Sequence, residues 1–254
     1  MDKTLQDSLF NYLLRLGDNQ LVLSHRLSEW CGHAPELELD IALANIGLDI
    51  LGQARTLLTL AGEVEGLGRD EDQLAYHRNE REFKNLLLCE QPNGDFAQTL
   101  VRQWFMDHYH QLLFTELSKS DYAPLAAFGV KSLKEVNYHL RFSSGWVQRL
   151  GLGTEESARR TQAAIDELWR FTGELFVTDE VEDALAEAGM IPRLAELAPQ
   201  WAIRVAEQAK QAELTLPAQA AYRQGGKQGL HTEHLGYLLA ELQSVQRSYP
   251  NMSW

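Results

Sequence analysis

Residues 41–54, IALANIGLDILGQA, decide the fold that this sequence predicts. The stretch is apolar except at Asn45, Asp49 and Gln53, which recur every four residues. A helix that is apolar on most sides is buried on most sides. We therefore expect a long, largely buried helix over about residues 35–63, with a proline in its first turn, where proline is well tolerated.

Three more long helices are predicted on either side of this stretch, over about residues 4–30, 96–119 and 124–150. In each of them leucine and aromatic residues step by three or four positions, which is the helical period. Helices of roughly 24–28 residues are about 36–42 Å long, and helices of that length usually pack side by side as a bundle. The sequence predicts an all-α protein.

The remaining helices are expected to be shorter. One is predicted at about 73–89, and three follow the fourth long helix, at about 154–176, 191–214 and 232–249. Residues 215–230, which are rich in glycine, are expected to be irregular. We expect a single helical domain over 1–254, with a core bundle at about 4–150 and C-terminal helices at about 154–249.

The composition excludes several classes of function. The chain has 23 Lys and Arg against 36 Asp and Glu, a net charge of −13, which argues against binding to nucleic acid. Two cysteines, Cys31 and Cys89, form no disulfide framework. The first residues lack the apolar core of a signal peptide, and no apolar run is long enough to span a membrane. We expect a cytoplasmic protein that binds no membrane.

Four acids stand in apolar surroundings, one in each long helix: Asp18, Asp49, Asp107 and Glu135. Within each successive pair the two acids are about 30 residues apart, which suits facing positions on two antiparallel helices joined by a loop. We therefore expect two helical hairpins joined by a crossover, with the four carboxylates meeting at the centre of the bundle.

Such a constellation is typical of ferritin-like di-iron proteins, in which each hairpin supplies one carboxylate and one Glu-x-x-His motif. Here the imidazoles are missing, because Gly52 follows Asp49 by three residues and Tyr138 follows Glu135 by three. The adjacent His139 is turned about 100° from the required face. The pattern therefore predicts a degenerate di-iron site at Asp18, Asp49, Gly52, Asp107, Glu135 and Tyr138.

Other interpretations of these polar residues remain open. The polar positions of the second long helix could form the solvated face of an ordinary amphipathic helix; they are Asn45, Asp49 and Gln53. The two histidines could be core or surface residues without a metal; they are His110 and His139. Inward acids without a metal need partners. The candidates are Arg15, Arg55, Arg102 and Lys131.

Two local motifs are weaker. His231 and His234 flank Glu233 and could bind zinc, but a helix start capped by Thr232 is the favoured interpretation. Residues 224–227, QGGK, could touch a phosphate, but a flexible connector is favoured.

Along nearly its whole length the sequence resembles the C-subunit family of ring-1,2-phenylacetyl-CoA epoxidases, multicomponent monooxygenases of phenylacetate degradation. The segments that carry the resemblance are spread over the chain and rich in low-frequency residues. They are residues 14–19, 29–36, 44–55, 88–94, 138–142, 168–171 and 229–236.

The resemblance implies a structural role in an oxygenase complex. A paralogous catalytic subunit of that complex, the A subunit, carries the di-iron site, and a reductase supplies electrons from NADPH through a flavin and an iron–sulfur cluster. This chain would have no catalytic residue, metal or cofactor of its own. Its partners would be the di-iron subunit and possibly the reductase and small subunits, and alone it would form a homodimer. The helices at about 4–30 and 35–63 are the expected interface, because the first is apolar around most of its circumference.

Two other classes of function stay open on the sequence. The chain could be an autonomous di-metal oxidase that uses Asp107, His110, Glu135 and His139 as ligands. It could also be a helical scaffold protein without a redox partner. Metal content separates the first alternative from the structural role, and co-purification with a partner separates the second.

Overall fold

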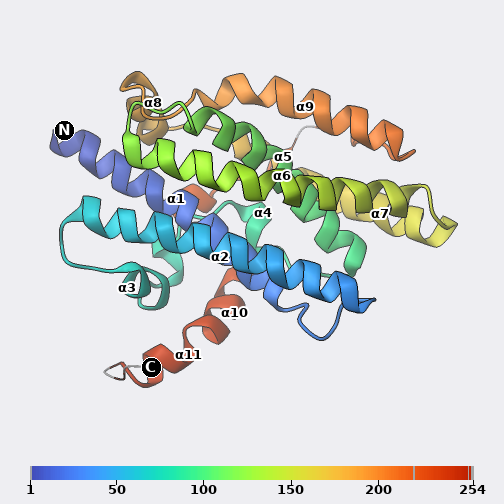
Figure 1. Ribbon diagram of the computed structural model, residues 1–254, viewed down its shortest axis with the longest axis horizontal. Coiled ribbons are helices and arrows are strands. Elements are labelled where there is room, and N and C mark those ends of the chain that lie inside the picture. The colour runs from blue at the N-terminus through green and yellow to red at the C-terminus, as the bar shows by residue number, and fades with distance from the viewer. Residues whose placement is uncertain (1, 220, 251, 253–254) are drawn as a thin grey trace. The chain divides into compact units, whose positions relative to one another are not determined.

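The computed structural model of the chain describes residues 2–219, 221–250 and 252. In that part of the chain the regular structure is entirely helical (Figure 1). The chain forms two compact units, and the first of them is discontinuous in sequence. It comprises residues 1–92 and 225–254, and the second comprises residues 93–224.

The first unit is built on a hairpin of two long helices, α1 (Lys3–Ser28) and α2 (Leu37–Glu65), which lie side by side (Figure 1). Asp2 caps α1 by accepting a 2.8 Å hydrogen bond from the backbone N–H of Leu5. Helix α2 ends at Gly66, whose φ of 73° is a left-handed conformation that glycine adopts without steric cost. Both helices confirm the sequence prediction to within a few residues.

The prediction of one helix at about 73–89 is wrong. The segment instead contains three short pieces, α3 (Glu71–Tyr76), η1 (Glu80–Glu82) and α4 (Leu87–Glu90). Between them the backbone leaves the helical conformation, so that its N–H groups are free to bond to side chains of α1. The N–H of Lys84 donates to Asp18, and that of Leu86 donates to Asn19. A continuous helix would have used these donors internally.

The second unit begins with another long hairpin, α5 (Phe96–Leu117) and α6 (Ala123–Gly151). The two helices approach closely at Gly129, where an added Cβ would lie 2.5 Å from the backbone nitrogen of Ser118. Both helices confirm the predicted bounds closely. The unit continues through α7 (Glu155–Leu168), η2 (Trp169–Phe176), α8 (Glu180–Glu187) and α9 (Leu194–Gln211).

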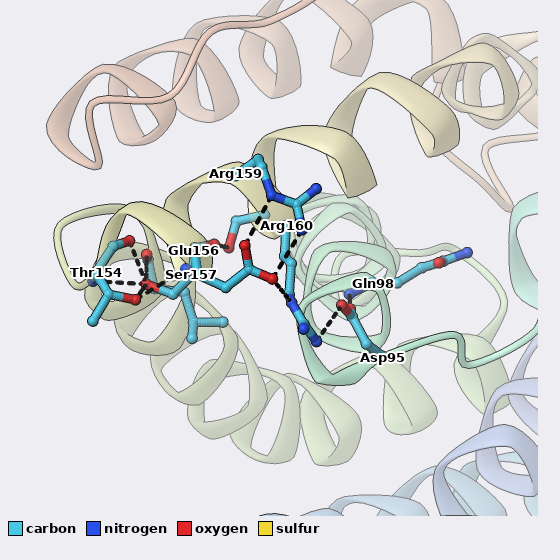
Figure 2. Close-up of polar contacts among 9 residues, drawn as sticks. Asp95, Gln98, Thr154, Glu156, Ser157, Arg159 and Arg160 are labelled. Atoms are coloured by element: carbon cyan, nitrogen blue, oxygen red, sulfur yellow. Dashed lines mark hydrogen bonds and ion pairs between the residues drawn. The ribbon is translucent and has the colours of Figure 1, made fainter.

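Exposed ion pairs connect the beginnings of α5 and α7, as Figure 2 shows. Asp95 caps α5 by accepting from the N–H of Gln98 at 3.0 Å. The guanidinium of Arg160 lies 3.5 Å from Asp95 and 2.6 Å from Glu156. Arg159 also donates to Glu156, at 2.8 Å. Because these pairs are exposed, they contribute little to stability, but they leave both arginines with a carboxylate partner.

The C-terminal residues differ from the prediction in detail. Helix α8 was not predicted, and the helix expected at about 232–249 is divided into α10 (Glu233–Leu242) and α11 (Ser244–Ser248). The break lies at Gln243, whose side-chain amide donates 3.0 Å hydrogen bonds to the carbonyl oxygens of Ala75 and Arg78. These bonds fasten the C-terminal segment to the N-terminal part of the first unit.

The predicted fold class is confirmed: the chain is all-α, with two long-helix hairpins joined by a crossover, as in ferritin-like proteins, and with further C-terminal helices. That the two hairpins meet in one bundle within a single domain stays a prediction. Among the residues that the structure describes, no helix is both long and apolar enough to cross a membrane.

Candidate functional site

Asp18 lies fully buried in the middle of α1 and is paired with an arginine. Both of its carboxylate oxygens accept from the guanidinium of Arg78, one of them at 2.9 Å. The backbone N–H of Lys84 donates a further 2.8 Å hydrogen bond to Oδ2. Asp18 is thus inward and compensated, as expected for a buried acid. The compensating residue is Arg78, which no sequence pattern had indicated.

The guanidinium of Arg78 is itself held from several sides. It donates to the carbonyl oxygens of Leu74 and Glu82 and lies over the ring of Phe83, with Cζ 4.3 Å from the ring centroid. The arginine is 3% exposed, so this ion pair is shielded from water. Of the four expected compensating residues, Arg15 and Arg102 are buried, and Arg102 donates to Asn93 at 2.6 Å. Arg55 is exposed and pairs with Glu71 at 3.0 Å, and Lys131 is also exposed.

A second buried carboxylate in the first unit, Glu90, was not predicted from the sequence. Its Oε1 accepts from the backbone N–H of Thr232 at 2.6 Å and from the Thr232 hydroxyl at 2.7 Å. Its Oε2 accepts from Asn85 at 2.9 Å and lies 2.8 Å from Nδ1 of His231. The only sequence signal for it is an acid that directly follows the apolar run at residues 86–89.

His231 faces a hydrogen-bond acceptor at each ring nitrogen. Nδ1 lies 2.8 Å from a Glu90 oxygen, and Nε2 lies 2.9 Å from the carbonyl oxygen of Phe83. Burial by itself would lower the pKa of His231, but the hydrogen bond and charge of Glu90 raise it above its ordinary value. Donation to both acceptors requires an N–H at each ring nitrogen, so this geometry favours the protonated ring. The contact with Glu90 joins the C-terminal segment to α4.

The zinc interpretation of His231 and His234 is not supported by this arrangement. His231 binds Glu90, and the described part of the chain contains no group of three or more histidine, cysteine, aspartate or glutamate side chains that could hold a metal ion. Helix α10 begins after Thr232, as the favoured interpretation expected. The Thr232 side chain, however, makes no cap hydrogen bond and donates to Glu90 instead.

In the second unit Asp107 is fully buried among polar side chains. Gln103 donates to Oδ1 and the Ser143 hydroxyl donates to Oδ2, each at 2.7 Å. Burial raises the pKa of Asp107 to about 6, although the nearby His139 and the two hydrogen bonds oppose the rise. The acid is therefore satisfied by neutral donors rather than by lysine or arginine.

The buried histidines of α5 favour the neutral form. Burial, with a smaller contribution from His139, lowers the pKa of His110 to about 3. Burial also lowers the pKa of His108 to about 4, and its Nε2 lies 2.7 Å from Oε1 of Gln208. His110 stacks on Phe114 with ring centroids 5.1 Å apart. These contacts match the interpretation of His110 as a core histidine.

The other two acids are only half-buried. Asp49 and Glu135 have intermediate exposure, whereas Gly52 and Tyr138 are exposed. The expectation that all four acids face inward is therefore confirmed for Asp18 and Asp107 and not for the other two. The three polar positions of α2 differ in exposure, since Asn45 is exposed, Asp49 is half-buried and Gln53 is buried. The alternative of a wholly solvated face is thus also wrong.

The residues present do not fit a di-iron centre. The Asp18 carboxylate is engaged by Arg78 and a backbone N–H, and Asp107 is engaged by Gln103 and Ser143. A bridging ligand must offer both oxygens to metal, and each iron of such a site takes an imidazole. Gly52 has no side-chain ligand atom, so this set of side chains does not supply what two irons would need.

Residues 224–227 do not form an open phosphate-binding loop. Gly225, Gly226 and Lys227 are buried, and a Cβ at Gly226 would lie 2.1 Å from the carbonyl oxygen of Asn85. Because only glycine allows this approach, the stretch packs tightly against the backbone that precedes α4. The connector interpretation fits better, although the connector is packed rather than flexible.

These features occur in a chain whose relatives can be recognised from sequence. The sequence model of the phenylacetic acid catabolic protein family matches residues 1–254. The chain belongs to this family. It is 56% identical over 248 residues to the C subunit of 1,2-phenylacetyl-CoA epoxidase from Escherichia coli (strain K12), an alignment that covers 98% of this chain and 100% of that protein. The resemblance carried by the seven sequence segments is thereby confirmed.

One surface of the first unit is conspicuously apolar. Along α2 the side chains of Leu37, Ile41, Leu48 and Leu51 are 72%, 52%, 65% and 44% exposed. We call these four residues the α2 stripe. The four residues are four, seven and three positions apart, which fits the heptad of a coiled-coil seam with Ala44 at the position between Ile41 and Leu48. Leu48 and Leu51 also line a groove of about 530 Å³, whose other side includes Tyr76 of α3.

Helix α1 offers no comparable surface. It is buried almost continuously from Tyr12 to Ser24. The expectation that the first helix carries an apolar interface is therefore not supported, because its apolar circumference is already covered. The exposed apolar face expected of the first hairpin belongs to α2.

Proposed function

We propose that this chain is the C subunit of a 1,2-phenylacetyl-CoA epoxidase and that it acts as a non-catalytic structural partner of the subunit that holds the di-iron site. The observation that carries the assignment is the identity of 56% to the Escherichia coli C subunit, which extends over the full length of that protein. The substrate comes from that relative alone, since no residue of the sites in this chain identifies a CoA ester.

The non-catalytic role is supported by the state of the four acids. Asp18 and Asp107 are already satisfied by protein donors, and the two imidazole positions hold Gly52 and Tyr138. A chain with this donor set is better suited to packing than to oxygen activation. In the proposed complex the di-iron site belongs to the catalytic partner, and flavin, iron–sulfur cluster and NADPH belong to the reductase.

The α2 stripe supports the proposed pairing. Exposed apolar residues in a row are typical of interaction surfaces, and permanent partners usually bury more than about 2,000 Å². A seam with coiled-coil spacing selects a helix with a matching apolar row. We propose that α2 packs against a helix of the di-iron subunit and that, without this partner, the same face pairs with a second copy of this chain. The small subunits and the reductase are further candidate partners.

The pairing is tested by co-purifying the chain with the di-iron subunit and measuring mass and stoichiometry by sedimentation. Leu48→Glu with Leu51→Glu should abolish both the complex and the homodimer, because four carboxylates would be buried in a symmetric pair and two in the mixed pair. The matched control is Leu152→Glu with Ile203→Glu, two similarly exposed apolar positions in the second unit. A complex that survives the α2 changes would contradict the proposed face.

The competing function, an autonomous di-metal oxidase, is tested by elemental analysis of the same preparations. The structural role predicts no stoichiometric iron in this chain when it is purified alone. About two irons per chain would overturn that role and favour Asp107, His110, Glu135 and His139 as ligands. A helical scaffold without a redox partner is favoured instead if the chain binds no other component of the epoxidase.

A further inference from the structure

A second surface, on the outer face of α6, combines arginine with aromatic side chains. Six residues line a shallow groove of about 300 Å³, and all of them come from this one helix. We call them the α6 stripe: Tyr138, Arg141, Phe142, Gly145, Trp146 and Arg149. They recur at intervals of three and four residues, so they share one face and extend about 16 Å along the helix.

The two arginines of the α6 stripe are ordered by aromatic rings rather than by acids. Cζ of Arg141 lies 5.5 Å from the ring centroid of Tyr138, and Cζ of Arg149 lies 5.0 Å from that of Trp146. Trp146 is held in turn by an edge-to-face contact with Phe96, with centroids 5.7 Å apart. Stacking occupies the flat side of a guanidinium and leaves its N–H edge available for a carboxylate.

Neither arginine forms an ion pair with any residue in the described part of the chain, although the protein carries a net charge of −13. Arg159 and Arg160, on the next helix, show the usual outcome, because both pair with Glu156 (Figure 2). Two cations kept apart from so many acids form a local positive surface that an acidic partner would recognise.

The composition of the stripe is that of a protein interface. Tyrosine, tryptophan and arginine are the residues most enriched among those that dominate binding energy. Phe142, Gly145 and Trp146 are partly buried, whereas Arg141 and Arg149 are exposed at either end. An apolar centre between charged ends is the arrangement of an interface core with its rim.

From this juxtaposition we infer that the α6 stripe is a docking site for an acidic helix of another protein subunit, separate from the α2 stripe. The bound helix presents an apolar residue to Phe142 and Trp146, above Gly145, where the absence of a side chain leaves room for it. It also presents carboxylates about 12 Å apart to Arg141 and Arg149, the distance that eight residues span along a helix. Covering the groove removes water from the stacked guanidiniums, which strengthens both the cation–π contacts and the ion pairs.

Tyr138 has a use at this docking site. That residue stands where a ferritin-like metal site would need an imidazole, yet it is 43% exposed and stacks with Arg141. The position contributes a docking anchor instead of a metal ligand.

The docking site rests on the proposed function for the identity of the partner, and the experiment separates the two. The full chain is titrated with each of the other epoxidase subunits, and dissociation constants are measured at two salt concentrations. The variant is Arg141→Glu with Arg149→Glu. The control is Arg159→Glu with Lys210→Glu, which changes the net charge equally at exposed sites outside the stripe.

We expect the α6 variant to weaken binding of one epoxidase partner by at least about 30-fold, the size of effect found for arginines that dominate an interface. The control should change it by less than about threefold, and binding by the unmodified chain should weaken as salt is raised. Arg141→Gln with Arg149→Gln, a milder change, should weaken binding in the same direction. Circular dichroism confirms that each variant is folded.

If the unmodified chain binds none of the epoxidase subunits, the proposed function fails. If it binds and neither α6 variant changes the affinity, the proposed function stands and the α6 inference is wrong. If the α6 variants alter only self-association of the chain, the stripe pairs two copies and the inference is likewise wrong. Hydrogen exchange gives an independent check, since residues 138–149 should become protected in the complex but not in the isolated chain.

Discussion

Replacing Arg78 by methionine should destabilise the chain severely. Arg78 lies 3% exposed against the fully buried Asp18, so Arg78→Met leaves a carboxylate buried with only the backbone N–H of Lys84 as donor. Removing one partner of a buried ion pair costs about 3–5 kcal/mol. For a protein of this size, that loss corresponds to a fall in melting temperature of roughly 6–20 °C.

The assay is thermal and urea unfolding of the isolated chain, followed by circular dichroism. The matched control is Arg55→Met, which breaks an ion pair whose arginine side chain is 76% exposed and should cost less than about 1 kcal/mol. The double variant Asp18→Asn with Arg78→Met removes both charges and should be more stable than Arg78→Met alone. The reasoning is refuted if Arg78→Met costs no more than Arg55→Met, or if the double variant is as unstable as the sum of its single changes.

Three further predictions concern the chain alone. Because the pKa of His231 is raised in the folded protein, the contribution of His231 to stability is present below about pH 6.5 and is lost as pH rises through the raised pKa. His231→Gln should therefore flatten this part of the curve of stability against pH. An unchanged slope would contradict a protonated His231. Asp107 has its pKa raised to about 6, so its contribution to stability is full below about pH 4 and is lost between about pH 4 and 6. Asp107→Asn keeps acceptor and donor positions for Gln103 and Ser143, and relative to the unmodified chain it should gain up to about 3 kcal/mol across that window; a variant less stable at pH 7 would show that the charged form is needed. Gly129→Ala should lower the free energy of unfolding in urea by about 1–3 kcal/mol, because the added Cβ would meet the backbone of Ser118. The control is Gly145→Ala on the same helix, where an added Cβ meets nothing within 4 Å, so this change should be neutral or slightly stabilising. Equal effects of the two changes would contradict the close packing of α5 and α6.

The long helices could be predicted from sequence because each carries an unbroken helical period over more than 20 residues. The crossover could not, because its conformation is set by contacts distant in sequence. Residues 73–89 have enough apolar periodicity to suggest one helix, but the buried acceptors Asp18 and Asn19 take the backbone donors of Lys84 and Leu86. Tertiary hydrogen bonding thus overrides local propensity there.

The candidate site was predicted in part. Asp18 and Asp107 could be found because a single acid among apolar residues of a long helix is informative. Arg78 could not be assigned to Asp18, because the two are 60 residues apart and several other cations were equally plausible. Glu90 and His231 are 141 residues apart, and no local pattern connects them.

The division among the four acids also depends on three-dimensional detail. Each of the half-buried acids, Asp49 and Glu135, lies about 30 residues after a fully buried one. The buried acids are Asp18 and Asp107, and the sequence places all four in apolar surroundings. The direction of a side chain from its helix depends on how that helix is rotated in its hairpin, and a rotation of one residue position is about 100°. Spacing along the chain predicts the height of a residue in a hairpin better than the side it faces.

The proposed role requires that this chain has no turnover of its own and that a catalytic partner depends on it. The most direct test is reconstitution with the reductase, NADPH and phenylacetyl-CoA, in which product is measured for the di-iron partner alone, for this chain alone and for the two together. We expect epoxide only when both are present, and we expect Leu48→Glu with Leu51→Glu to abolish it. Full turnover by the di-iron partner without this chain, or any turnover by this chain without that partner, would contradict the proposed structural role.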